Sequence, residues 1–375
     1  MERKITAINF VEAFVTGSLI VIIPLLLFNR GIEIAEIGLI LAVMPLVFLF
    51  ARLLFASIAD QAGFKPIFII EWIARMAALV IYAIAATPLA FAFGKISEGI
   101  MQSGFWAVNR TAIFHYAKGK EADTSARFAG LRTLGTAFGI MAAGWAIAVV
   151  PFDYVIIALL GFAFACGMFP IGLEGGIRVK VDPAKTLASL SPLGRRKLFW
   201  LTSIAMMLYA FAVYPIINLV APLFMRSQLG YDYGLIGTAF AIYYLTVGLT
   251  NIAGMRLGLH KAAYTFAQAF VFVLGASLIA VFGNYIFIPL FVLLALGDGL
   301  ASITYENIVV KMTKDTRLVS VNIGLLHVPF RVAEFSGIII AGFLAQYMGF
   351  EYVFIVSGIS FAAFSFITWF ILSKD

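Results

Sequence analysis

The chain has 375 residues, of which 63% are hydrophobic and 12% are charged, and its formal net charge is +7. A soluble globular protein carries about 25% charged residues, so this composition excludes a water-soluble domain of ordinary kind. One cysteine and three histidines exclude a disulfide within the chain and leave little material for a metal or haem site, so we expect no cofactor, no metal ligand and no catalytic residue.

About twelve windows of the chain are apolar and long enough to cross a membrane. A helix needs roughly 20 such residues to span ~30 Å of hydrocarbon at 1.5 Å per residue. No small-residue cleavage site interrupts the first window, so we expect it to remain as a span. In chain order, the predicted helices cover residues 5–28, 35–58, 66–87, 89–116, 127–149, 152–173, 198–222, 231–254, 262–284, 286–311, 318–347 and 351–372.

The basic residues between these spans indicate an orientation in the membrane rather than nucleic-acid binding. Loops on one side hold Lys65, Lys118, Lys120, Arg127, Arg178, Lys180, Lys185, Arg195, Arg196, Lys197, Arg256, Lys261, Lys314 and Arg317. Loops on the other side hold Arg30 and Arg226. Because positive loops stay inside, we expect both termini to be cytoplasmic and the chain to lie in the plasma membrane.

Two halves of the chain repeat one another at an offset of about 200 residues. The matched segments are Pro24-Leu25 with Pro222-Leu223, Gly31-Ile-Glu33 with Gly230-Tyr-Asp232, Ile37-Gly38 with Ile236-Gly237, Glu98-Gly99 with Asp298-Gly299, Gly139 to Gly144 with Gly337 to Gly342, and Phe152 to Val155 with Phe350 to Val353. We therefore predict an N-terminal six-helix bundle at 1–173, a cytoplasmic linker at 174–197 and a C-terminal six-helix bundle at 198–375. Six spans per half give both halves the same orientation, with a pseudo-twofold axis along the membrane normal.

The connection between the second and third spans resembles a signature of the major facilitator superfamily. From Ala56 to Lys65, Asp60 and Gly63 stand at the spacing of that signature, with Ala56 in place of its first glycine. Two further segments are similar to motifs of the same family: Lys95-Ile-Ser-Glu98-Gly99 on span four, and Gly135 to Gly144 on span five, with Ile140 where proline is usual. The resemblance covers the whole chain and implies twelve helices in two bundles, with a substrate site near the midplane.

Asp60, Gly63 and Lys65 are predicted to form a gating loop. The Asp60 carboxylate can accept hydrogen bonds from free amides at a helix N-terminus, where the dipole favours negative charge. Gly63 permits a tight turn between antiparallel spans. A solvated aspartate beside a turn glycine is the alternative interpretation.

The glycines of spans five and eleven allow close helix contact in lipid, because they remove side chains at helical spacing. We assign to helix packing Gly135, Gly139, Gly144, Gly337 and Gly342. A role of the span-five glycines in selecting the transport direction is the alternative.

Ionisable residues inside the spans are the most informative feature of the sequence. They are Glu12, Arg52, Glu71, Arg75, Lys95, Glu98, Arg110, Arg132, Asp298, Glu306, Arg331 and Glu334. An unpaired charge at the bilayer centre costs roughly 2.5–3.5 kcal/mol, so each needs a partner, a wet cavity or neutralisation. Equal numbers of acids and bases predict that most are paired, and they argue against a strongly anionic substrate.

A proton-coupled carrier needs a carboxyl group whose protonation changes between conformations. Burial favours the neutral carboxyl group and a nearby cation favours the ionised one. Glu98 beside Lys95 is subject to both effects, and Asp298 is its counterpart in the repeat. Glu12 is a third candidate, with Arg52, Arg110 or Arg132 as its partner. For each acid, a static salt bridge is the alternative, and the pair Glu71 and Arg75 is assigned to structure.

Amphipathic side chains on the remaining spans suit a ligand that is partly apolar and partly hydrogen-bonding. The substrate-cavity candidates are Trp106, Arg110, Tyr209, Tyr214, Asn218, Tyr243, Tyr244, Tyr305, Arg331 and Glu334. His327 could relay protons, or it could be a buried histidine bonded to a carbonyl.

These features favour a secondary transporter that works by alternating access, as a monomer, with a small-molecule substrate and protons as partners in the lipid bilayer. Proton-coupled efflux of an amphipathic compound, by antiport, is the first hypothesis. Proton-coupled uptake of a sugar or similar metabolite is the second. A lipid-handling protein or membrane enzyme is a third, disfavoured because the HExxH and GxSxG patterns are missing from the sequence, as is the nucleotide-binding GxxxxGK[ST] pattern.

Overall fold

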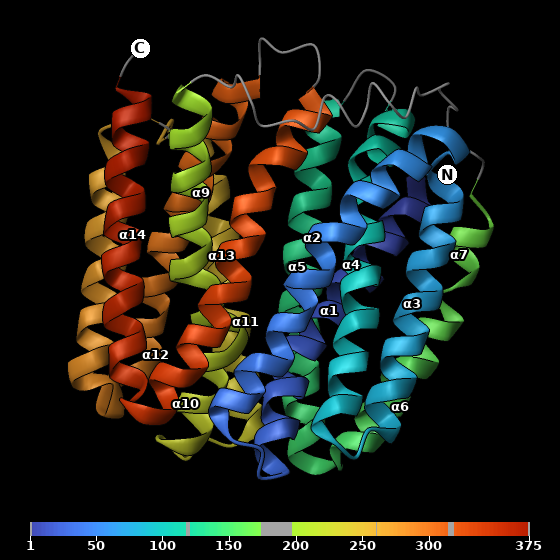
Figure 1. Ribbon diagram of the computed structural model, residues 1–375, viewed down its shortest axis with the longest axis horizontal. Helices are drawn as coiled ribbons and strands as arrows, with labels where there is room; N and C mark the ends of the chain where they lie inside the picture. The colour runs from blue at the N-terminus through green and yellow to red at the C-terminus, as the bar shows by residue number, and fades with distance from the viewer. Residues whose placement is uncertain (1, 118–120, 174–196, 260, 314–318, 374–375) are drawn as a thin grey trace. The chain divides into compact units, whose positions relative to one another are not determined.

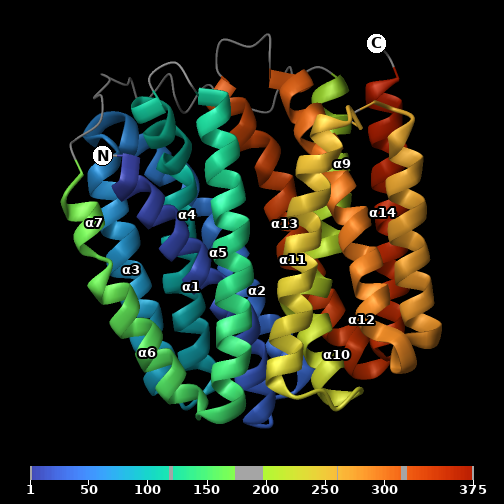
Figure 2. The same ribbon diagram turned by 180° about the vertical axis from the view of Figure 1, so that it is seen from behind.

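The computed structural model describes residues 2–117, 121–173, 197–259, 261–313 and 319–373, and every regular element in these ranges is helical (Figure 1). The predicted linker at 174–197 lies outside the described residues except for Lys197, where a helix begins. The elements up to residue 173 are α1 (Glu2–Asn29), α2 (Ile34–Ala62), α3 (Phe64–Ile84), α4 (Pro88–Ala117), α5 (Glu121–Val149), α6 (Phe152–Ala165) and α7 (Met168–Ile171). The later elements are α9 (Lys197–Pro215), the π-helix η1 (Ile216–Val220), α10 (Ala221–Ser227), α11 (Tyr233–Arg256), α12 (Tyr264–Thr313), α13 (Val319–Tyr347) and α14 (Phe350–Leu372), seen from behind in Figure 2.

The described helices confirm the predicted membrane spans. Ten helical segments among the described residues are long and apolar enough to cross a bilayer. One of them lies in α12, which joins two predicted spans at Ile286, a residue with non-helical φ −135° and ψ 39°. A further long helix, α4, is less apolar because charged and amide side chains lie along it. Dividing α12 at Ile286 and counting α4 recovers the twelve predicted spans.

Residue contacts divide the chain into two units. The first unit contains Met1–Ile32, Ile40–Thr186 and Asp232–Ala241, and the second contains Glu33–Leu39, Leu187–Tyr231 and Ile242–Asp375. The start of α2 thus belongs with the second unit and the start of α11 with the first. The bundle limits drawn from the sequence stay predictions.

Equivalent helices pair in the same way in each unit. In the first unit α1 packs along α5, and α3 packs against α4 and α6. In the second unit α9 packs along α13 and α14, and α12 packs along α14. The pairs α1–α5 and α9–α13 occupy equivalent positions in the sequence repeat, so the repeat extends from residue identities to packing.

Glycine allows the closest helix approaches inside each unit. A side chain at Gly139 would collide with the Phe14 carbonyl of α1, and one at Gly135 would come within 3.0 Å of the Phe10 carbonyl. Further along α5, a Cβ on Gly144 would lie 2.7 Å from the Gly237 Cα of the same unit.

The second unit repeats this arrangement. A Cβ on Gly342 of α13 would lie 3.2 Å from the Gly38 Cα, and one on Gly337 would lie 3.0 Å from the Pro215 ring. These geometries support the packing interpretation of all five predicted glycines.

Two short connections show why the repeat keeps glycine in its turns. Gly31 has φ +77° and Gly230 has φ +66°, and both close the turn that follows a span. No atom crowds either position, so backbone conformation alone selects glycine there.

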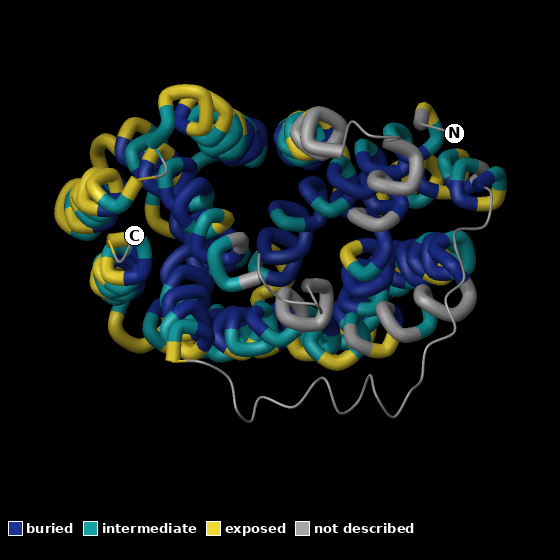
Figure 3. The backbone as a smooth tube through the Cα atoms, turned by 90° about the horizontal axis from the view of Figure 1, so that it is seen from above, coloured by how far each residue is buried: buried dark blue, intermediate teal, exposed yellow. Residues whose placement is uncertain are grey.

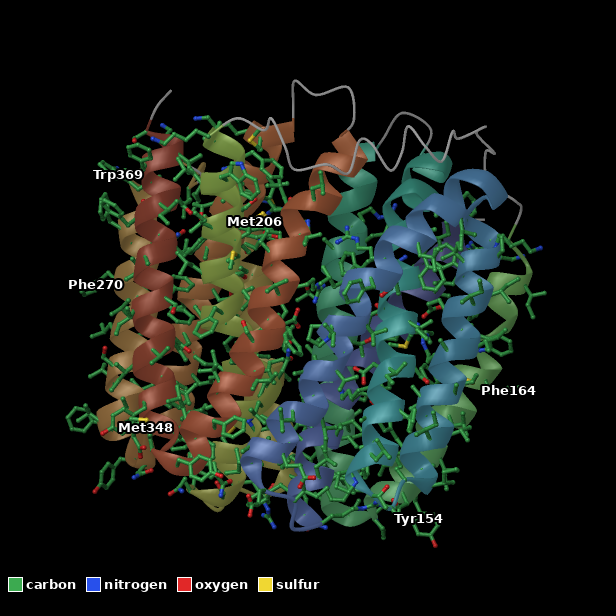
Figure 4. All side chains as sticks on the ribbon, viewed as in Figure 1. Tyr154, Phe164, Met206, Phe270, Met348 and Trp369 are labelled. Carbon is green, nitrogen blue, oxygen red and sulfur yellow. The ribbon has the colours of Figure 1, made fainter. Side chains whose placement is uncertain are left out.

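The outer helix surfaces are apolar, as a lipid-facing surface requires. Figure 4 shows Phe164 and Phe270 projecting away from their helices, and these side chains are 66% and 68% exposed in the absence of a membrane. In the view from above in Figure 3, single helices carry buried positions on one side and exposed positions on another. Met206 of α9, in contrast, is fully buried within the second unit.

Candidate functional site

The first unit holds a buried acid that is paired with a cation. The Glu98 side chain on α4 is 4% exposed. Its Oε2 atom accepts hydrogen bonds from Lys95 Nζ at 2.7 Å and from the Tyr82 hydroxyl of α3, also at 2.7 Å. The ammonium group of Lys95 also lies 5.8 Å from the centre of the Tyr82 ring. The charge of this carboxylate is therefore compensated within the protein.

The second unit holds a buried acid with different neighbours. Asp298 on α12 is 6% exposed. Its Oδ1 atom accepts a hydrogen bond from the Tyr209 hydroxyl of α9 at 2.6 Å, and its Oδ2 atom accepts one from the Tyr243 hydroxyl of α11 at 2.9 Å. Within the described part of the chain, Asp298 makes no ion pair.

The two acids occupy equivalent places in their units. The glycine after each one lets a neighbouring helix approach closely. A Cβ on Gly99 would lie 2.7 Å from Val47 Cβ of α2, and one on Gly299 would lie 2.6 Å from Thr250 Cβ of α11. The local packing is thus preserved while the partners of the carboxyl groups differ.

A polar ring surrounds the third predicted acid, Glu12. This fully buried carboxylate on α1 forms an ion pair with Arg132 of α5 and accepts a hydrogen bond from the Thr16 hydroxyl at 3.1 Å. Gln102 Nε2 donates to Thr16 Oγ1 at 3.0 Å, and Trp106 Nε1 donates to Gln102 Oε1 at 3.2 Å.

The guanidinium group of Arg132 completes the ring. It lies 4.6 Å from the ring centre of Trp106 and 4.5 Å from that of Phe105. Of the three arginines considered from the sequence, Arg132 is the one seen to pair with Glu12. Because Trp106 is 40% exposed, the ring reaches the surface of the first unit.

Sequence reasoning missed a buried amide pair between α1 and α4. Asn9 and Asn109 each donate to the other's side-chain oxygen, at 2.8 and 2.9 Å. A polar stripe at helical spacing, continued by Gln102 on α4, was the signal that could have revealed them. The same polar stripe includes Thr16 on α1 and Gln102 on α4, which sequence reasoning also missed.

Aromatic side chains gather around Asp298. The Tyr209 and Tyr305 rings lie 5.3 Å apart, and the Tyr305 hydroxyl lies 3.2 Å from His327 Nε2. Tyr244 packs edge-on against Tyr243 at 5.7 Å. His327 is thus hydrogen-bonded to a hydroxyl group, and both sequence interpretations, a proton relay or a bond to a carbonyl, stay predictions.

Other predicted cavity residues lie on α9, η1 and α13. Tyr214 packs edge-on against Phe330 at 5.2 Å, and Asn218 lies in η1, a π-helical segment of the kind often found at functional sites. Arg331 pairs with the buried Glu334 one turn along α13.

The pair of Arg75 with Glu71 is also present, on α3, and both side chains are buried. Its enclosure is consistent with the structural role assigned to it from the sequence.

The predicted gating loop is shorter than the sequence suggested. Helix α2 continues to Ala62 and α3 begins at Phe64, so Asp60 and Lys65 are helical and Gly63 alone connects the helices. Gly63 has φ +81°, as a tight turn requires. The helix therefore continues through the polar residues Asp60 and Gln61, where a loop was expected. The side chains of Asp60 and Arg110 lie outside the described residues.

Among the described residues, no three His, Cys, Asp or Glu side chains are arranged to hold a metal ion.

Comparisons with known proteins decide the family. The family profile described as Major Facilitator Superfamily matches residues 5–317 and 202–375. The chain belongs to the major facilitator superfamily. This superfamily member is therefore a secondary transporter with a small-molecule substrate, and not an enzyme.

The fold agrees with this assignment. A crystal structure of a point mutant of the nucleoside transporter NupG matches with a TM-score of 0.79 and 14% sequence identity, over 99% of each chain. At this identity the similarity concerns the fold alone. No curated protein matches the sequence of this chain.

Proposed function

We propose that this transporter is coupled to protons and that Asp298 carries the coupling proton. The observation that supports this most directly is the set of partners around Asp298, two neutral hydroxyl groups and no cation in the described chain. An ionised carboxylate buried without a compensating charge is unstable in a membrane protein, because neither water nor a cation stabilises it. Protonation removes this cost.

The other candidate acids are less suited to the role. Glu98 is paired with Lys95, and Glu12 with Arg132. Breaking a buried ion pair leaves an uncompensated charge and costs about 3–5 kcal/mol. A proton cycle at Glu98 or Glu12 would meet this cost at every turnover, so we assign these acids to fixed salt bridges.

For the substrate we propose an amphipathic organic compound, and for the direction efflux by antiport. The tyrosines around Asp298 and the indole of Trp106 combine apolar surface with hydrogen-bonding groups, which suits such a ligand. The glycines of α5, similar to an antiporter motif, favour antiport over symport.

Uptake by proton symport is the second candidate. Its substrate would be a sugar or a similar metabolite, and nucleosides are included in the substrate panel because a nucleoside transporter has a similar fold. We further propose that both termini are cytoplasmic, from the distribution of basic residues. The proposed location is the plasma membrane and the proposed state is a monomer.

The test uses the full chain in liposomes that contain a trapped pH indicator. Drugs, sugars, nucleosides and amino acids are added in turn to wild type, to Asp298→Asn and to the control double variant Lys95→Ala with Glu98→Gln, which removes both charges of the first-unit pair. We expect a substrate-triggered pH change in wild type and in the double variant, and its loss in Asp298→Asn. The sign of the change separates antiport from symport. Substrate flux without proton movement in wild type would contradict the proposal.

A further inference from the structure

The two halves of the repeat differ at one position near Glu98 and Asp298, the two acids that the repeat matches. Lys95 stands three residues before Glu98, on the same face of α4. Three residues before Asp298 the chain has Ala295, which is fully buried. The repeat thus keeps the acid and its following glycine but lacks the ammonium group in the second half.

The hydrogen-bonding capacity of the Asp298 carboxylate is only partly used within the described chain. A carboxylate can accept about four hydrogen bonds. Two of these come from Tyr209 and Tyr243, one on each oxygen. The remaining lone pairs have no donor among the described residues, so each oxygen can accept a further N–H group.

The aromatic rings near Asp298 add to this preference. Tyrosine faces attract organic cations, with energies of about 0.5–2 kcal/mol depending on desolvation. Tyr209 with Tyr305, and Tyr243 with Tyr244, form two ring pairs, and one tyrosine of each pair donates a hydrogen bond to Asp298. A hard metal cation prefers several oxygen ligands, and the hydroxyl hydrogens here are directed at the carboxylate, so the surroundings favour an organic cation.

We infer that Asp298 recognises the ammonium group of an organic substrate, which takes the place that Lys95 occupies beside Glu98 in the first half. This inference rests on the proposed proton coupling, since the proton and the substrate ammonium then compete for one carboxyl group. Binding of the cation releases the proton, which is the exchange that an antiporter needs. The substrate class is a monovalent arylalkyl amine in its protonated form.

The experiment measures proton release from the purified full chain in detergent, with a pH indicator in weak buffer. Benzylammonium, adjusted to the same pH, is titrated into the protein over the neutral to mildly acidic range, and benzyl alcohol serves as the neutral control. We expect about one proton released per bound benzylammonium in wild type, none with benzyl alcohol, and none in Asp298→Asn.

Two matched variants at Ala295 separate charge from bulk. Ala295→Lys supplies the missing ammonium group within the protein, so benzylammonium should release no proton from this variant. Because its ammonium group can pair with Asp298, Ala295→Lys should also be more heat-stable than Ala295→Met. Ala295→Met fills a similar volume without charge, so it should still release protons if benzylammonium reaches Asp298. Loss of release in Ala295→Met together with a normal melting transition would assign the effect of Ala295→Lys to bulk and would overturn the inference.

Failure of this inference can be told from failure of proton coupling. An Asp298-dependent pH change in liposomes with neutral substrates, without proton release by benzylammonium, would keep the coupling and overturn the cation site. The absence of any Asp298-dependent proton movement with any compound would overturn both.

Discussion

The two units hold equivalent acids in different chemical surroundings. In the first unit Glu98 forms an ion pair with Lys95, and Glu12 forms one with Arg132. The negative charges of both acids are therefore neutralised within the protein. In the second unit Asp298 meets only tyrosine hydroxyls in the described chain. A repeated fold can therefore preserve the position of an acid while its partners change from a cation in one copy to two hydroxyl groups in the other, and the proposed proton exchange at Asp298 rests on this difference.

The largest expected effect comes from making the first unit resemble the second. Lys95→Ala leaves the Glu98 carboxylate buried without its cation, and we expect the free energy of unfolding to fall by about 3–5 kcal/mol. Denaturant titration of the purified protein measures this loss. The double variant Lys95→Ala with Glu98→Gln removes the uncompensated charge and should recover most of the stability. If the double variant is no more stable than Lys95→Ala, the pair is not what stabilises this region.

The hydroxyl donors provide a second comparison. Tyr209→Phe deletes one of two hydrogen bonds to Asp298, whereas Tyr82→Phe leaves Glu98 with its stronger partner, Lys95. A hydrogen bond to a charged group contributes about 1.5–3 kcal/mol, so Tyr209→Phe should lower the rate of substrate-driven proton movement by about 10- to 100-fold. The liposome pH assay measures it, with Tyr82→Phe expected near wild type. Equal effects of the two variants would contradict the asymmetry between the units.

The helix contact between α1 and α5 should show a smaller effect. Gly139→Ala places a methyl group against the Phe14 carbonyl, and we expect a loss of about 1–3 kcal/mol in unfolding free energy. Gly161→Ala on α6 is the matched control, because a Cβ there has no atom within 4 Å. Similar stability of the two variants would show that α5 can move away from α1 without cost.

The smallest effect is expected at the turns that the two halves share. Gly31→Ala and Gly230→Ala each force a side chain into a positive φ, at a cost of about 1–2 kcal/mol. Thermal unfolding should show equal decreases for the two variants, since the turns are equivalent. A decrease at only one of them would mean that the repeat is not matched in these turns.

Hydropathy and local spacing predicted much of the fold. The window at 5–28 became α1 (Glu2–Asn29), because apolar length alone determines whether a helix can span a bilayer. Pairs three or four residues apart, such as Lys95 with Glu98, follow from helix geometry. Local pattern could not reveal that α2 continues past Asp60, since the polar residues there resemble a loop.

The sequence by itself determined the membrane spans, the internal repeat and the list of buried charges, because these depend on composition and on spacing along one helix. Only the tertiary structure decided which charges meet. Arg132 pairs with Glu12 across 120 positions, and Tyr209 reaches Asp298 across 89. Such partners are brought together by helix packing, which depends on contacts between segments far apart in the chain. That packing gave Glu12 its cation and gave Asp298 two tyrosines.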